Sequence, residues 1–426
     1  MNLYQFTQTL FLWCENHNIP VALCRPKFTV DEFENTDLDI AVDGKDIEKL
    51  IQWLKGQHYQ VTCCYERHDG VTYHFYKQLP DNQSFFFHID FITSFEICGV
   101  SYFRLKEIFN RSYVLNGINY LDMVDQSVVL IVMHGLKHRN SKKIQQYYSF
   151  LNNSLKEYSF AIQEKLESIF GATQAADIIN AIRINQPILP SFSSFFSTAW
   201  KTNGVLSFVG VIQYYLNEIM IRFKVPKTNI VFLGVDGAGK TSLINRLQQE
   251  LHESFPIIKH AHLLPALPWQ QEKNAHIVQN NPHNKPKRSY LFSLLKLFYF
   301  FARYWFVMLC PSRKPILYLY DRYIYDLAID PIRFRYNGPK NLQRIFEFFP
   351  KPDLCFIVDV SPETAQLRKQ EVSFKETKRQ VLAYRELKGQ IPNSYILKNE
   401  FPMEKITTIT KDIVIQKLVS NNENQH

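Results

Sequence analysis

A glycine-rich segment near the middle of the chain has residue types and a spacing suited to holding phosphate groups. Gly234, Gly239, Lys240 and Thr241 fit the pattern G-x-x-x-x-G-K-[ST], the Walker A sequence of a P-loop. Apolar residues before this segment favour a buried strand, and leucine and isoleucine at helical spacing after it favour a helix. In such a loop, backbone N–H groups bind phosphate oxygens and the helix N-terminus adds partial positive charge. The sequence therefore predicts a nucleotide-binding loop.

Side chains of this segment can be given roles by their chemistry. Lys240 can contact the terminal phosphates of bound ATP, and the Thr241 hydroxyl can ligate Mg²⁺. Asp236 needs a different partner, because a carboxylate beside a triphosphate is electrostatically unfavourable. Its carboxylate would gain a partner either by capping the turn or by forming an ion pair with Arg322. The predicted ATP-binding residues are Gly234, Val235, Asp236, Gly237, Ala238, Gly239, Lys240, Thr241 and Ser242.

A second acidic element follows a later apolar segment. Residues 316–320 predict a buried strand that delivers Asp321, Arg322 and Tyr323 at its carboxyl end, where α/β sheets place ligand chemistry. Asp321 can hold Mg²⁺ or its water shell, and Arg322 can bind a second phosphate through two hydrogen bonds. We therefore expect Lys240, Asp321 and Arg322 to be catalytic, with Thr241 and Asp321 as the metal ligands.

The order of these residues resembles the thymidylate kinase family. The matching residues are the loop 234–241, Asp321-Arg322-Tyr323, Asp359 and Arg368. Residues 321–336 are similar to a bacterial branch in which a nucleotidyltransferase-like domain precedes the thymidylate kinase-like one. The resemblance implies a five-stranded parallel sheet flanked by helices, with ATP and Mg²⁺ as cofactors. It also implies that Asp236 accepts a hydrogen bond from a sugar hydroxyl of the acceptor.

The acceptor itself is less closely specified. We expect it to be bound by Asp236, Arg303, Arg322 and Tyr323, under a lid that carries Arg368, Lys375 and Arg379. The lid segment 369–379 lacks the pattern of the thymidylate kinase lid, and residues 260–265 differ from the arginine-bearing loop that holds the nucleoside monophosphate in that family. The predicted reaction is ATP + dTMP giving ADP + dTDP. Two alternatives stay open: a kinase acting on a non-nucleotide sugar or glycan acceptor, and an ATP-dependent switch that controls the N-terminal domain.

The first 120 residues carry a separate set of acidic residues. Asp37 and Asp39 share one face of a predicted strand, and Asp90 lies on a later strand. Three such carboxylates can hold two divalent ions around a triphosphate. This segment resembles the polymerase-β-like nucleotidyltransferases, whose D-x-D motif and later aspartate match these positions. The Gly-Ser pair of that family is absent, and Arg25 or Lys27 would have to bind phosphate instead. Solvated aspartates on an edge strand are the plain alternative.

The length and composition of the chain indicate its domain organisation and the kind of partner it binds. A chain of 426 residues exceeds what one hydrophobic core usually organises. We expect an α/β P-loop domain at 226–426, preceded by a smaller α+β nucleotidyltransferase-like domain at 1–120 and a helical connector at 121–225. The formal charge of +9 suits phosphorylated ligands, nucleic acid or an anionic surface. The motifs favour a nucleotide or a phosphorylated small-molecule acceptor, with no nucleic acid partner.

The cysteines and the apolar segments bear on where the protein is located and whether it spans a membrane. The seven cysteines have no metal-binding spacing and are predicted to be reduced thiols in a cytoplasmic protein. The apolar segment 204–217 is too short to cross a bilayer, and 291–310 is interrupted by Lys296 and Arg303. We expect both to be core helices, with no membrane span. The oligomeric state stays open, a homodimer included.

Overall fold

The computed structural model describes residues 2–26, 30–33, 37–79, 84–137, 144–187, 190–267, 270 and 286–423. The chain divides into two compact units. The first comprises Met1–Gln60 and Cys64–Ile221, and the second comprises Val61–Cys63 and Arg222–His426.

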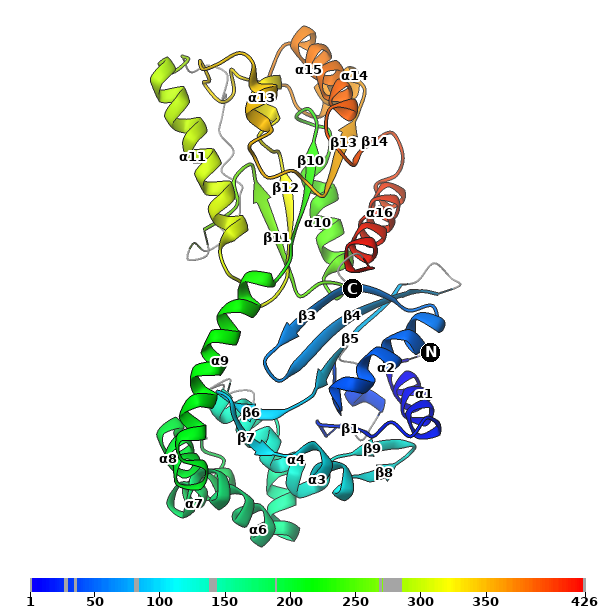
Figure 1. Ribbon diagram of the computed structural model, residues 1–426. Helices are drawn as coiled ribbons and strands as arrows, with labels where there is room; N and C mark the ends of the chain where they lie inside the picture. The colour runs from blue at the N-terminus through cyan, green and yellow to red at the C-terminus, as the bar shows by residue number, and fades with distance from the viewer. Residues whose placement is uncertain are drawn as a thin grey trace. The chain divides into compact units, whose positions relative to one another are not determined.

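The first unit is built on a mixed seven-stranded sheet in the order β3-β4-β5-β2-β1-β9-β8 (Figure 1). Strands β2 and β5 run parallel with Asp39 opposite Asp90, so these two side chains lie on the same face. A separate two-stranded ribbon pairs β6 with β7. The strands are β1 Val21–Leu23, β2 Asp37–Val42, β3 Gln60–Arg67, β4 Gly70–Gln78, β5 Ser84–Ile92, β6 Phe95–Ile97, β7 Val100–Phe103, β8 Tyr113–Leu115 and β9 Ile118–Tyr120.

Helices complete this unit. Helices α1 and α2 lie side by side, with the rings of Trp13 and Trp53 stacked at 5.1 Å between centroids. The later helices share one hydrophobic core with the sheet, in which Ala22 and Ala41 pack with Val128 and Leu166. The described helices are α1 Leu3–Asn16, η1 Val30–Phe33, α2 Gly44–Gly56, α3 Leu105–Arg111, α4 Met123–Leu130, η2 Ile131–Lys137, α6 Tyr148–Phe170, α7 Ala172–Arg183, α8 Phe192–Asn203 and α9 Val205–Lys224.

The second unit contains a five-stranded sheet in the order β11-β12-β10-β13-β14, and every neighbouring pair is parallel. The predicted five-stranded parallel sheet flanked by helices is therefore confirmed, whereas the nucleotidyltransferase-like nature of the first unit stays a prediction. In the central strand β10, residues 228–233 are all buried, as expected where helices cover both faces of a parallel sheet. The strands are β10 Lys227–Leu233, β11 Ile257–His262, β12 Ile316–Asp321, β13 Leu354–Asp359 and β14 Ser394–Lys398.

Helices cover this parallel sheet. Helix α10 turns Leu243, Ile244, Leu247 and Leu251 into the core, because these residues recur at helical spacing. Helices α10 and α16 pack against each other (Figure 1). The described helices are α10 Lys240–Leu251, α11 Tyr290–Leu309, α12 Asp326–Ile329, α13 Leu342–Phe346, α14 Pro362–Arg368, α15 Phe374–Glu386, η4 Leu387–Gly389 and α16 Met403–Glu423.

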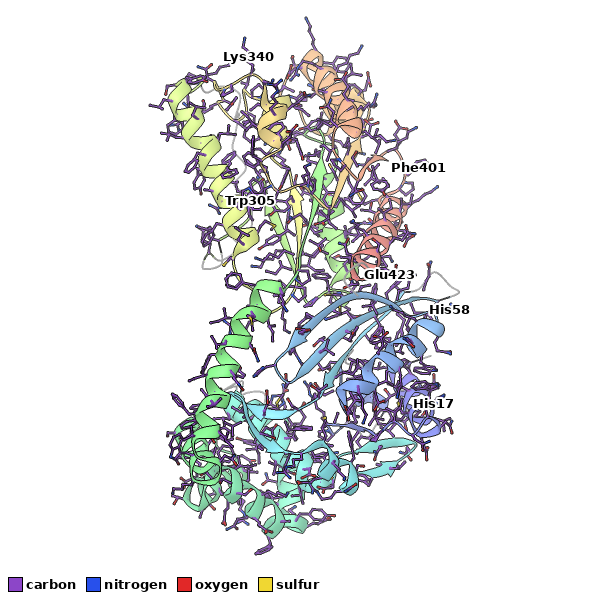
Figure 2. The ribbon with its side chains drawn as sticks, in the orientation of Figure 1. His17, His58, Trp305, Lys340, Phe401 and Glu423 are labelled. Carbon is purple, nitrogen blue, oxygen red and sulfur yellow. The ribbon has the colours of Figure 1, made fainter. Side chains whose placement is uncertain are left out.

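The prediction that both long apolar segments are core helices is wrong. Helix α9 buries only Ser207, and α11 buries one stripe while Leu291, Phe298 and Leu309 are each about two-thirds exposed. Trp305, labelled in Figure 2, projects from α11 and its indole N–H donates to Phe348 O at 2.8 Å. Among the described residues, α11 is the one helix whose length and composition would allow it to cross a membrane, and this is weak evidence by itself. Apolar composition predicted burial, but only one face of α11 meets the sheet.

Candidate active site

The Walker segment forms the turn between β10 and α10. Gly234, Gly237 and Gly239 all have positive φ, and Gly239 is the left-handed residue directly before Lys240, where α10 begins. A Cβ at Gly237 would lie 2.7 Å from the carbonyl oxygen of Ala365. Glycine is thus required both for the backbone conformation and for the close approach of neighbouring backbone. The loop consequently presents its backbone at a helix N-terminus, as phosphate binding requires.

Lys240 is held inside this loop. Its side chain is buried, and its ammonium donates to Gly234 O at 2.8 Å and to Val235 O at 2.9 Å. Burial and the Arg322 guanidinium lower the pKa of the Lys240 ammonium, although Asp321 opposes the shift. The loop therefore concentrates a cation where the phosphates of a nucleotide would bind.

Thr241 and Asp321 meet because β10 and β12 are adjacent parallel strands. Phe232 is in register with Asp321, so the strand ends bring the loop and the carboxylate together. The Thr241 hydroxyl donates to the Asp321 carboxylate. Burial alone would raise the pKa of Asp321, but Lys240 and the Thr241 hydroxyl together lower it, so the carboxylate is ionised at neutral pH. A hydroxyl and a carboxylate are hard oxygen donors of the kind Mg²⁺ prefers, and this pair fits such an ion.

Asp236 is the centre of an ion-pair network at the mouth of the loop. One carboxylate oxygen accepts from Arg322 and the other from Arg333. Arg333 also donates to Glu371 at 2.8 Å. Burial would raise the pKa of Asp236, but Arg322, Lys240 and Arg333 hold that pKa well below its usual range. The carboxylate in the loop is therefore fully ionised and orients two guanidinium groups.

Arg322 is also held by partners other than Asp236. Its Nη1 donates to Asp326 Oδ1 at 3.0 Å, and the Tyr384 hydroxyl donates to the same oxygen at 2.5 Å. Its backbone has φ of +83°, which is rare for a residue other than glycine and is held here by surrounding structure. The Arg322 side chain is buried with these partners and has little freedom to move.

The sequence matches no protein-family profile and no curated protein. Nucleoside and nucleotide kinases are among the solved structures to which the chain is similar. A deoxyadenosine kinase from M. mycoides, solved with bound dATP, is 15% identical with a TM-score of 0.30 over 44% of this chain and 97% of that one. A thymidylate kinase from Candida albicans is 16% identical with a TM-score of 0.32 over 47% of this chain and 94% of that one. These values do not establish a family for this chain.

Not all of the other predicted acceptor and lid residues contact the phosphate-binding loop. Arg368 lies near the loop, with its Nη1 3.4 Å from Gly237 O. Arg303 instead donates to Pro265 O at 2.9 Å, and Arg379 contacts Ile329 O and Glu376. Lys375 is exposed on the first turn of α15. The structure thus brings Arg368 to the phosphate-binding loop but gives Arg303 and Arg379 other partners.

Tyr323 is not available for acceptor binding in this arrangement. It is almost fully buried, and its hydroxyl donates to Pro350 O at 2.6 Å. Since the chain leaves the strand at Arg322, the next side chain turns into the core instead of the loop mouth. Its assignment as an acceptor ligand is corrected accordingly.

Four residues of the site were not predicted from the sequence. Arg333 and Glu371 join the lid segment to Asp236, while Asp326 and Tyr384 hold Arg322. A weak signal existed for Arg333, which lies in the segment 321–336 that carried the resemblance to kinases. Nothing in the spacing of Glu371 or Tyr384 pointed to this role.

The acidic residues of the first unit are held by arginines. Arg25 pairs with Asp37 at 2.7 Å and with Asp39, while Arg67 pairs with Asp90 at 2.5 Å. Burial raises the pKa of Asp39 to about 6 even though Arg25 opposes the shift. Within the described ranges no group of three or more histidine, cysteine, aspartate or glutamate side chains is placed to hold a metal ion. Each of the three carboxylates predicted as metal ligands thus pairs with a guanidinium group, with Arg25 shared between Asp37 and Asp39. Lys27 lies outside the described residues.

Proposed function

We propose that the second unit transfers the γ-phosphoryl group of ATP to a small phosphorylated acceptor. The observation that carries this proposal is the contact of Thr241 with Asp321 beside the buried ammonium of Lys240. A cation, a hydroxyl and a carboxylate at one helix N-terminus form the set that phosphoryl transfer uses. A loop that merely connected a strand to a helix would not need these three groups together.

The residues of the site would have different roles in the transfer. Backbone N–H groups of the loop and the Lys240 ammonium bind the terminal phosphates and stabilise charge as it moves toward the leaving oxygen. Arg368, close to Gly237, adds a second positive group on the lid side. Thr241 and Asp321 would hold Mg²⁺, which neutralises phosphate charge when bound. Because the site is walled by buried side chains, these charges act in a medium of low effective dielectric constant.

The two guanidinium groups on Asp236 favour an anionic acceptor. Arg322 and Arg333 both place a guanidinium group beside Asp236. Arg333 is the more exposed of the two and can bind a phosphate through paired hydrogen bonds. Asp236 already accepts one hydrogen bond on each oxygen, but each oxygen keeps a lone pair for a sugar hydroxyl. A nucleoside monophosphate offers both groups. We therefore propose dTMP or a related monophosphate as the acceptor.

The test is an acceptor screen. The purified full-length chain is incubated with Mg-ATP and with dTMP, the other nucleoside monophosphates or unphosphorylated sugars, and ADP release and product are followed. We expect ADP to appear in proportion to a phosphorylated acceptor and to stop when the acceptor is consumed. Phosphorylation of unphosphorylated sugars alone would replace the monophosphate proposal with a sugar kinase. Slow ADP release that no acceptor changes would contradict phosphoryl transfer and favour an ATP-dependent switch.

A further inference from the structure

The segment between α14 and α15 reaches the acceptor side of the site through Glu371. Helix α14 ends at Arg368 and α15 begins at Phe374, and the two helices pack against each other (Figure 1). Glu371 lies in the connecting segment, and its Oε2 accepts a hydrogen bond from Arg333 Nη1 at 2.8 Å. The phosphoryl transfer proposed above gives this contact no role.

Two carboxylates share the Nη1 atom of Arg333. This nitrogen donates to Asp236 Oδ2 and to Glu371 Oε2, and these two bonds use both of its N–H groups. The side chains of Arg333 and Glu371 are only 17% and 15% exposed, so solvent screens their charges incompletely. A phosphate that binds Nη1 must therefore replace one of the two carboxylates.

Glu371 is the carboxylate that is easier to replace. Its other oxygen, Oε1, pairs with the Lys369 ammonium at 2.6 Å, so its charge would keep a cation after the bond to Arg333 is lost. Asp236 belongs to the phosphate-binding loop and also holds Arg322, so moving it would break two ion pairs. Arg333 would in turn keep Asp236 as its anchor while Glu371 leaves.

Phosphate binding to the other N–H groups of Arg333 would also be affected by Glu371. The guanidinium group has further donors on Nε and Nη2. A phosphate on these donors would share one cation with Asp236 and Glu371, and like charges at short range repel each other in a partly buried site. Glu371 therefore lowers the affinity of Arg333 for a phosphate in either position.

We propose that Glu371 competes with the phosphate group of the acceptor for Arg333. The phosphate replaces the Glu371 carboxylate, and Glu371 then stays paired with Lys369. This inference rests on the proposed function, because it takes Arg333 as a ligand of the acceptor's phosphate. A phosphate with two negative charges gains more from the guanidinium group than a carboxylate with one, so the exchange favours a phosphorylated acceptor.

Chemical labelling of Arg333 tests this competition without requiring turnover. The full-length chain is treated with phenylglyoxal at saturating Mg-ADP, and the labelling rate of each arginine is followed by peptide mass spectrometry. Inorganic phosphate is the probe, and potassium chloride at the same ionic strength controls for screening. Arg344, exposed on α13 in the same unit, is the internal control. The variants are Glu371→Gln, which keeps the shape of the side chain, and Glu386→Gln, an exposed change on α15.

We expect phosphate to slow the labelling of Arg333 but not of Arg344. Half-protection of Arg333 should need about threefold to tenfold less phosphate in Glu371→Gln than in wild type, and Glu386→Gln should match wild type. A residue that merely held Arg333 in place would give the opposite sign, because its loss would weaken phosphate binding.

Three results would each overturn the inference: an equal or higher phosphate requirement in Glu371→Gln, no protection of Arg333 by phosphate, or equal protection by chloride. Failure of the proposed function is recognised separately. It would appear in the acceptor screen as no ADP release with any monophosphate, whereas the labelling of Arg333 is measured without turnover.

Discussion

Arg322 and Asp236 form an ion pair that ties the carboxyl end of β12 to the phosphate-binding loop. The two residues are 86 positions apart in the chain, and the pair is completed by Arg333 on the other carboxylate oxygen. An acidic residue in a phosphate-binding loop is unfavourable by itself. Here its charge is offset by two guanidinium groups, which it holds at the loop mouth.

Asp236→Asn separates the roles of this carboxylate. The change removes a negative charge near the phosphates, so ATP affinity should be kept or improved. Arg322 and Arg333 lose their common anchor and an acceptor hydroxyl loses its partner, so kcat/KM for the acceptor should fall by on the order of tenfold to a thousandfold. Steady-state kinetics with each substrate varied would measure both effects. Loss of ATP binding with an unchanged acceptor KM would assign Asp236 to loop architecture only.

Lys240→Ala should reduce phosphoryl transfer by on the order of a hundredfold to a thousandfold or more, because the loop loses its cation for the transferring phosphoryl group. Circular dichroism should show a folded protein. Lys340→Ala, which changes an exposed lysine of the same unit, is the matched control and should keep wild-type activity. A folded Lys240→Ala protein with wild-type turnover would refute the proposed role.

Asp321→Asn tests the metal site. The mutant should need about ten times more Mg²⁺ for half-maximal activity, because a carboxylate ligand beside Thr241 becomes a neutral amide. Asp359→Asn is a suitable comparison, since Asp359 ends the neighbouring strand β13 but is bound by Arg385 at 2.8 Å. Its Mg²⁺ dependence should match the wild type. The same Mg²⁺ midpoint in Asp321→Asn and wild type would exclude Asp321 as a ligand.

Arg333→Met removes a guanidinium group from the acceptor side. We expect the KM of a monophosphate acceptor to rise by on the order of tenfold to a hundredfold while the KM of ATP stays within about twofold. Arg335→Met, two residues further along, is the control because Arg335 donates to Pro286 O away from Asp236. If both variants changed the acceptor KM equally, a local disturbance of the segment would explain the result better than phosphate binding.

Asp39 should make the stability of the first unit depend on pH. Its pKa in the folded chain is raised to about 6, above its ordinary value of 3.8, so the folded state binds a proton more tightly than the unfolded state. The contribution of Asp39 to stability is therefore greatest below about pH 4 and falls as the pH rises toward 6. Urea unfolding of wild type and Asp39→Asn should show a difference that shifts in favour of the mutant between pH 4 and pH 6.5. Asp177→Asn, an exposed change on α7, should show no such shift.

Several features of the fold could be predicted from local sequence. The Walker pattern fixed the positions of the strand, the loop and the helix around Lys240, because glycine at specified places is a backbone requirement. The apolar strand 316–320 predicted Asp321 at its carboxyl end for a similar reason, since a parallel sheet exposes only its strand ends to ligands. Hydrophobic periodicity and the need for glycine in a turn both depend on residues that are close together in the chain. Such patterns are therefore visible in the sequence.

The partners of the charged residues required the tertiary structure. Arg333 lies 97 residues from Asp236, and Arg67 lies 23 residues from Asp90, so no spacing rule connects them. The sequence identified Asp37, Asp39 and Asp90 by their strand faces, but whether a metal ion or an arginine neutralises them depends on which side chains the fold delivers. The motif 321–323 suggested a ligand role for Tyr323, and apolar composition suggested burial of the whole of α11. In the fold Tyr323 is buried and the outer face of α11 is exposed. Burial and ion pairing are properties of three-dimensional neighbours, and chain order alone does not determine them.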